Sequence, residues 1–278
     1  MMKGLVGKIG SVVVWAAVVL YLAWAVRECS VRERDIPAAG VVVVVSDSAQ
    51  MGVITPGMVR GWISAANFIP NNSAVREVPV AGIEKLVRSR GFVRDASVYT
   101  DMKGVTHVEI TQRRPMVRFG TSTGYDFYVT DDGWVLPLQP HAPMWLPVVT
   151  GDYTPPFGRG FIGKLPAEEK NMDENYRFLH NLINFVGFIS DDSYWSAQIE
   201  QINITAAHAG TAPMRAQDYQ VEIVPRSGNH VVMLGGLDGY RAKLDKLQRF
   251  YAGGLGYEGW DTYRYINLKY KNQIVCTK

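Results

Sequence analysis

Cysteine is scarce in this sequence, with only Cys29 and Cys276 among its 278 residues. Cys29 follows a hydrophobic segment and Cys276 lies near the other end, so a disulfide would tie the tip of the chain back to that segment. We therefore expect two unpaired thiols. The residues before Cys29 are Val26-Arg27-Glu28, not the small residues of a lipoprotein cleavage site, which argues against lipidation.

A strong excess of one charge is also missing. The net charge is +3, and no stretch carries the dense Lys/Arg runs that phosphate backbones require, so we expect no nucleic-acid partner. Hydrophobic residues make up 47% and charged residues 20%, proportions that exclude wholesale disorder.

Signatures of catalysis and of bound metals or cofactors are lacking too. The one G-x-G-x-x-G match, Gly254–Gly259, follows a helical pattern, whereas a dinucleotide fingerprint follows a strand. No G-x-S-x-G, S-x-x-K or activated-cysteine motif occurs. The histidines lie singly, without the spacing of metal ligands: His107, His141, His180, His208 and His230. We expect no metal, no cofactor, no small-molecule substrate and no enzymatic activity.

One long hydrophobic run is present, residues 9–26, which read IGSVVVWAAVVLYLAWAV and carry no charge. As a helix it would be about 27 Å long, close to the thickness of a bilayer core. It predicts an uncleaved transmembrane anchor rather than a buried core helix. Residues 1–8 would then be a cytoplasmic tail and residues 27–39 a juxtamembrane linker, with the remaining chain outside the cytoplasm.

Residues 40–119 predict a small α/β unit in the order strand, helix, helix, strand, strand. The run GVVVVV at 40–45 favours a strand buried on both faces. Thr55-Pro56 predicts a helix start, and Val80, Ile83 and Val87 predict the apolar face of a second helix.

Residues 120–278 predict a mostly antiparallel β domain with flanking helices. One helix is expected after Asn171 and another after Asp238, the latter with Lys243 and Lys246 facing outward. The whole chain is therefore predicted to be α+β.

The carboxy-terminal stretch YINLKYKNQIVCTK predicts a strand at an open sheet edge. Ile266, Leu268 and Tyr270 alternate with Tyr265, Asn267 and Lys269, so the first set is typical of a core face. The strand is long, lacks proline, and could accept a strand from a partner. The predicted partner-binding residues are Tyr265, Ile266, Asn267, Leu268, Lys269, Tyr270, Trp260 and Tyr263.

Several short motifs, in order along the chain, resemble the FtsQ/DivIB family of cell-division proteins. They are Gly91-Phe92-Val93, Val108-Glu109-Ile110, Gln112-Arg113-Arg114-Pro115, Tyr128-Val129-Thr130-Asp131-Asp132-Gly133, Pro147-Val148-Val149-Thr150-Gly151 and the carboxy-terminal stretch. The resemblance implies a POTRA domain followed by a β domain, in a single-pass inner-membrane protein at the division septum. It implies a non-catalytic scaffold that recruits FtsB- and FtsL-type proteins, with FtsB adding a strand at the last strand, and that meets other division proteins through the POTRA domain. Residues 46–78 depart from the family pattern, so no POTRA contact residue is predicted.

Two other classes remain open at this point. A membrane-anchored cell-wall enzyme would need acids or a nucleophile that converge from distant positions. A POTRA-containing transport component would need many more alternating strands after residue 120 than the sequence provides.

Overall fold

The computed structural model describes residues 14–28, 36–46, 52–69, 73–139, 144–167, 172–206 and 218–278. By its contacts the chain divides into two compact units, Met1–Gln112 and Arg113–Lys278. This division falls upstream of the boundary at residue 119 that the sequence suggests. The reason is that β4 (Pro115–Thr121) belongs to the sheet of the second unit.

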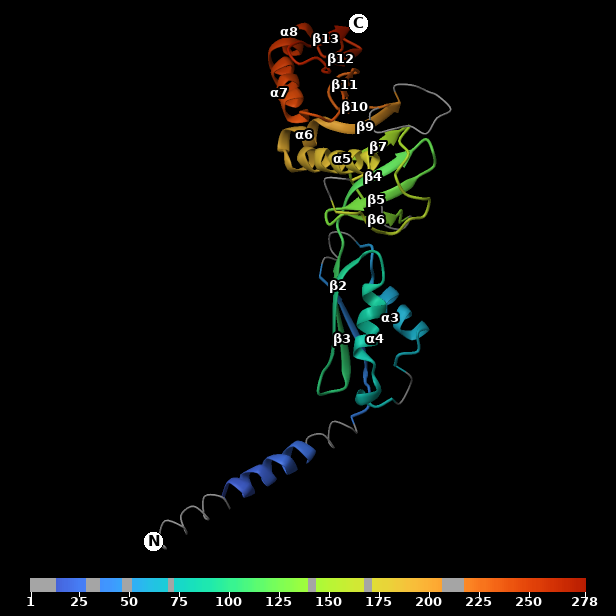
Figure 1. Cartoon of the computed structure of the whole chain (residues 1–278), viewed down its shortest axis with the longest axis vertical. Helices are drawn as coiled ribbons and strands as arrows, with labels where there is room; N and C mark the ends of the chain where they lie inside the picture. The colour runs from blue at the N-terminus through green and yellow to red at the C-terminus, as the bar shows by residue number, and fades with distance from the viewer. Residues whose placement is uncertain are drawn as a thin grey trace, which may run out of the picture. The chain divides into compact units, whose positions relative to one another are not determined.

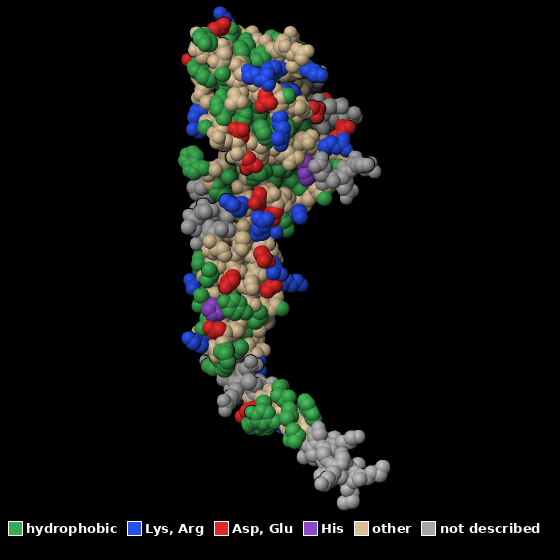
Figure 2. All heavy atoms as spheres, turned by 90° about the vertical axis from the view of Figure 1, so that its left-hand side faces the viewer, with side chains coloured by type: hydrophobic (Ala, Val, Ile, Leu, Met, Phe, Trp, Pro, Cys, Tyr) green, Lys and Arg blue, Asp and Glu red, His purple; other side chains and the backbone are tan. Residues whose placement is uncertain are grey.

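Residues 14–28 form a helix that covers part of the predicted anchor. Its large apolar side chains, Trp15, Tyr21 and Trp24 among them, are exposed. Figure 2 shows a cluster of hydrophobic side chains, in green, on this helix. In the parts of the chain that the structure describes, no helix has both the length and the hydrophobicity that a bilayer crossing requires. Residues 1–13 and 29–35, which hold the predicted tail, the start of the anchor and part of the linker, lie outside the described residues.

The first unit is a three-stranded sheet with helices on one face (Figure 1). Its elements follow the predicted order: β1 (Gly40–Val45), α3 (Pro56–Ala65), the 3-10 turn η1 (Val75–Glu77), α4 (Val80–Arg88), β2 (Val93–Thr100) and β3 (Val105–Gln112). β3 lies in the middle, parallel to β1 and antiparallel to β2. α3 begins, and α4 packs, as their sequences predict. Thr55 Oγ1 accepts the Met58 N–H at 3.3 Å, Pro56 occupies the first turn of α3, and Ile83 and Val87 of α4 are fully buried.

The prediction that the valine strand is buried on both faces is wrong. In β1, Val43 and Val45 are buried, but Val42 and Val44 are 44% and 50% exposed. The helices cover only one face of this sheet, and β1 is one of its edges, so alternate valines face solvent.

The second unit is built on a ten-stranded mixed sheet in the order β13-β12-β11-β10-β9-β7-β4-β5-β6-β8. Its strands after β4 are β5 (Asp126–Thr130), β6 (Trp134–Pro137), β7 (Val148–Gly151), β8 (Gly163–Lys164), β9 (Ile199–Ala206), β10 (Tyr219–Pro225), β11 (Val231–Gly235), β12 (Tyr265–Asn267) and β13 (Val275–Thr277). The pairs β4–β7, β7–β9 and β11–β12 are parallel, and the other pairs are antiparallel. The α+β class and the mostly antiparallel sheet are thus confirmed.

The helices of the second unit close a single core over this sheet. They are α5 (Glu174–Asp191), α6 (Ser193–Gln198), α7 (Tyr240–Phe250), the π-turn η3 (Tyr251–Leu255) and α8 (Gly256–Glu258). Leu182 of α5 and Leu244 of α7 belong to the same buried cluster as Ile202 of β9 and Ile266 of β12. Burial of such side chains is the main stabilising contribution to this unit.

β7 and β9 approach each other closely at Gly151. Its φ is +103°, and a Cβ there would lie 2.1 Å from the carbonyl oxygen of Ile204 on β9. Only glycine fits this position without moving β7 away from β9.

Candidate partner-binding site

β12 lies between two strands of its own sheet, which corrects the prediction of an open edge at Tyr265–Tyr270. Ile266 stands opposite Val232 of β11 on one side and opposite Cys276 of β13 on the other. The outermost strand at this end of the sheet is β13, and its outer side has no strand partner among the described residues. The carboxy-terminal stretch is therefore a hairpin rather than one long strand.

The strand ends early because of a local hydrogen bond. Asn267 Oδ1 accepts the N–H of Lys269 at 3.0 Å, a side-chain turn that competes with continued strand geometry. Lys269, Tyr270 and Lys271 follow as an exposed loop. The chain then reverses direction into β13.

The predicted contact residues on this hairpin divide by burial. Ile266 and Leu268 are fully buried, so their side chains belong to the core and are not available at the surface. Tyr265 is 37% exposed and Tyr270 is 51% exposed. Asn267 is half-buried and Lys269 is exposed. The accessible side chains are therefore the two tyrosines and Lys269.

Trp260 and Tyr263 lie on the segment that leads into β12, partly buried against the core. The Trp260 ring packs edge-on against Tyr251, with centroids 5.1 Å apart. The hydroxyl of Tyr263 donates to Glu258, and this hydrogen bond raises the pKa of the Tyr263 hydroxyl. Both residues hold the segment in place, and both are only partly buried.

His230 fixes the start of β11 to this segment, a role that sequence reasoning missed. It is 1% exposed; its Nε2 lies 2.8 Å from the hydroxyl of Tyr251 and its Nδ1 lies 3.3 Å from the carbonyl oxygen of Trp260. Burial lowers the pKa of His230 and raises the pKa of Tyr251, so both groups are neutral. A lone histidine in a sequence carries no signal for such a contact, because its partners are 21 and 30 residues away.

The sequence predicted that two lysines of α7 face outward, and this prediction is wrong. Both ammonium groups bind backbone carbonyl oxygens of the second unit. Lys243 Nζ donates to the carbonyl oxygens of Leu234 and Gly236, at 3.0 and 2.6 Å. Lys246 Nζ donates to those of Tyr270 and Gln273 in the β12–β13 loop, at 2.6 and 3.2 Å. Desolvation lowers the pKa of both ammonium groups. Lys246 therefore connects the β12–β13 loop to α7 through two hydrogen bonds.

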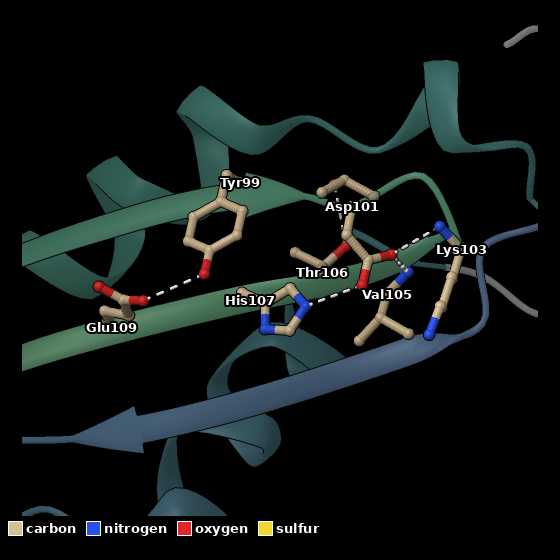
Figure 3. Close-up of polar contacts among 8 residues, drawn as sticks. Tyr99, Asp101, Lys103, Val105, Thr106, His107 and Glu109 are labelled. Atoms are coloured by element: carbon tan, nitrogen blue, oxygen red, sulfur yellow. Dashed lines mark hydrogen bonds and ion pairs between the residues drawn. The ribbon is translucent and has the colours of Figure 1, made fainter.

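A second exposed surface lies on the uncovered face of the three-stranded sheet (Figure 3). Tyr99 of β2 stacks on His107 of β3, with ring centroids 5.0 Å apart, and its hydroxyl donates to Glu109 at 3.1 Å. That hydrogen bond raises the pKa of Tyr99. Apolar area is also exposed on this face, at Val42 and Val44 of β1.

The turn beside this surface is held by one carboxylate. Asp101 Oδ1 accepts the N–H groups of Lys103 and Val105, at 2.8 and 2.9 Å, and Oδ2 lies 3.1 Å from His107 Nε2. The hydrogen bond from His107 holds the pKa of Asp101 below its usual value. His107 therefore braces the β2–β3 turn.

No group of three or more His, Cys, Asp or Glu side chains among the described residues is arranged to hold a metal ion. His230 and His107 are each engaged with neighbouring side chains or backbone, as described above. The surfaces described above combine a strand edge, aromatic rings and exposed apolar side chains. These are features that bind polypeptides.

Residues 114–277 match the family model described as FtsQ/DivIB, C-terminal related. The chain belongs to the FtsQ/DivIB family. Residues 38–111 match the model of a POTRA-like domain, so the first unit of this FtsQ/DivIB member corresponds to a POTRA-like domain and the second to the family's characteristic region. No curated protein matches the chain significantly. The family assignment places the chain among cell-division proteins.

Proposed function

We propose that this chain is a non-catalytic scaffold that collects FtsB- and FtsL-type proteins at the division septum. Membership of the FtsQ/DivIB family supports the cell-division role. The uncharged segment at 9–26 and the exposed apolar side chains of the helix at 14–28 support an anchor in the inner membrane. The amino terminus would be cytoplasmic and both compact units periplasmic.

The observation that carries the binding role is the carboxy-terminal end of the ten-stranded sheet. There, β13 is only three residues long, Val275 is 40% exposed, and the side away from β12 has no strand partner among the described residues. A partner strand can pair with backbone groups at this end of the sheet, and each hydrogen bond gained contributes about 1 kcal/mol net. Tyr265, Tyr270 and Lys269 flank the edge and would give specificity.

The POTRA-like unit would supply a separate contact with other division proteins. Its uncovered sheet face presents Tyr99, Val42 and Val44 beside the polar groups of His107 and Glu109. An exposed aromatic ring beside apolar side chains is the composition that protein interfaces favour.

Site-specific photo-crosslinking in cells tests the proposal. We would place a photo-reactive residue at Tyr265 or at Tyr270, which are 37% and 51% exposed, and a control one at Met102, which is 90% exposed on the β2–β3 turn. The proposal expects the FtsB-type partner to crosslink at the first two positions and not at the control. Equal yields at all three positions, or no partner at Tyr265 and Tyr270, would contradict it.

A further inference from the structure

The β12–β13 hairpin is held much more firmly on one side than on the other. On the β11 side, Val231 N–H donates to Arg264 O and Leu268 N–H donates to Met233 O, both at 2.9 Å. Ile266 and Leu268 anchor β12 in the core with no exposed side-chain area. Breaking this side would open the core.

The β13 side carries little burial. Val275 and Thr277 face outward and are exposed, and only Ile274 and Cys276 pack partly against the core. The strand pairs with β12 over three residues, and the backbone bond from Arg264 N–H to Thr277 O adds one contact at 2.8 Å. β13 can therefore leave without disturbing the pairing of β12 with β11.

We infer that β13 is a resident strand that covers the binding edge of β12, and that a partner strand takes its place rather than adding outside it. This inference rests on the proposed function, and it names how that site is regulated. In the absence of a partner, β13 occupies the edge of β12. A partner strand that binds this edge more tightly than β13 displaces it. Lys246 contributes to the closed state, because its ammonium group holds the hairpin loop at Tyr270 and Gln273.

The geometry of β13 describes the partner that fits. The segment would run antiparallel to β12, since that is the direction β13 takes. It would carry apolar residues at two alternate positions, in place of Ile274 and Cys276, which face the core. The residues between them would face solvent, as Val275 does.

The outer edge of β13 is a poorer site for the same segment. A strand added there would lie beside Val275 and Thr277, which are exposed, so it would bury little apolar area. The edge of β12 instead lies next to the fully buried Ile266. Burial of apolar side chains adds to backbone pairing, so the β12 edge binds more tightly.

A reversible disulfide lock tests the inference in the full chain. Tyr265 and Thr277 are opposite residues on β12 and β13, and opposite residues on antiparallel strands lie within the range of a disulfide. The variant carries Tyr265→Cys and Thr277→Cys, with Cys29→Ser and Cys276→Ser to prevent other bridges. A matched control places the disulfide between β9 and β10, by Thr205→Cys and Gln220→Cys in the same serine background.

The inference expects the oxidised lock to bind the FtsB-type partner at least about tenfold more weakly than the reduced protein, because β13 can no longer leave. The control disulfide should leave the affinity unchanged. Equal or tighter binding by the oxidised lock would overturn the inference, since the partner would then be adding outside β13. Failure of the serine background itself to bind the partner would instead overturn the proposed function.

A second variant keeps the test independent of engineered disulfides. Lys246→Met removes the clasp on the hairpin loop, so partner affinity should rise severalfold if β13 must leave. Arg249→Gln, an exposed cation on the same helix, should leave it unchanged. A decrease, or no change, with Lys246→Met would contradict displacement.

Discussion

His230 Nε2 lies 2.8 Å from the hydroxyl of Tyr251, and its Nδ1 faces the carbonyl oxygen of Trp260. The carbonyl can only accept, so Nδ1 carries the proton and Nε2 accepts from the tyrosine. This neutral histidine joins the start of β11, the π-turn after α7 and the segment that enters β12. The neutral ring of His230 therefore helps to hold the segment that leads into the hairpin.

Stability of the second unit should fall as the solution becomes acidic through the histidine range. Burial lowers the pKa of His230, whereas an unfolded histidine titrates near about 6.5. Between these two values the unfolded state binds more protons, so the free energy of unfolding decreases as the pH falls. Asp261, the nearby carboxylate, opposes the shift and makes it smaller.

Urea unfolding at several pH values between 5 and 8 would measure this slope. His230→Gln retains hydrogen-bonding groups without a titrating ring, so its free energy of unfolding should depend less on pH over this range. An identical slope in the two proteins would show that His230 does not contribute.

The Lys246→Met variant should loosen the hairpin without unfolding the unit. It removes two donors to the backbone oxygens of Tyr270 and Gln273, a loss of about 1–3 kcal/mol for charged hydrogen bonds, reduced here by partial solvent exposure. Hydrogen exchange followed by mass spectrometry should speed up in residues 270–277 and stay unchanged in β9 and β10. Uniformly faster exchange across the unit would point to a global effect instead.

Leu268→Ala should destabilise the second unit strongly. The side chain is fully buried, so its loss leaves a cavity and costs about 2–5 kcal/mol. Tyr270→Ala, two residues further along, removes a side chain that is 51% exposed and should cost about 0.5 kcal/mol or less. Urea unfolding of both variants would check this difference, and similar costs would contradict the burial described for the two positions.

Gly151→Ala should disrupt the contact between β7 and β9. The added Cβ would meet the carbonyl oxygen of Ile204 at 2.1 Å in a backbone conformation that L-residues avoid, so we expect a loss of more than about 2 kcal/mol. Gly120→Ala in β4 is the matched control, because its Cβ would find only Asp126 Oδ1 at 3.4 Å. Thermal unfolding of the two variants side by side would separate strain from the general effect of replacing a glycine.

Local patterns predicted several elements of this chain correctly. Thr55-Pro56 begins a helix as expected, and the alternation at Ile266 and Leu268 identifies two buried side chains. These features depend on residues close together in the sequence. The family resemblance, confirmed over residues 114–277, also came from short motifs in their order along the chain.

The end of the chain shows where such patterns fail. Alternation continues through Tyr270, yet the strand stops at Asn267, because one side-chain hydrogen bond to Lys269 turns the backbone. The prediction that β1 is buried on both faces fails for a related reason, because a run of valines does not indicate whether a second layer covers the strand. The hydrogen bonds of Lys246 and of His230 join residues that lie 21 to 30 positions apart, so no local sequence pattern predicts them.

The parallel pairs at the centre of the large sheet also impose an order of assembly. β4 pairs with β7, and β7 pairs with β9, so Gly120, Thr150 and Asn203 are neighbours in the sheet. Because they lie far apart in the sequence, they are synthesised at different times. The hairpins β4–β5 and β5–β6 can close as soon as they are synthesised, but β7 has no second neighbour until β9 arrives. Distant pairings slow folding. A newly synthesised chain would therefore expose this incomplete sheet to aggregation and proteolysis until its second half has formed.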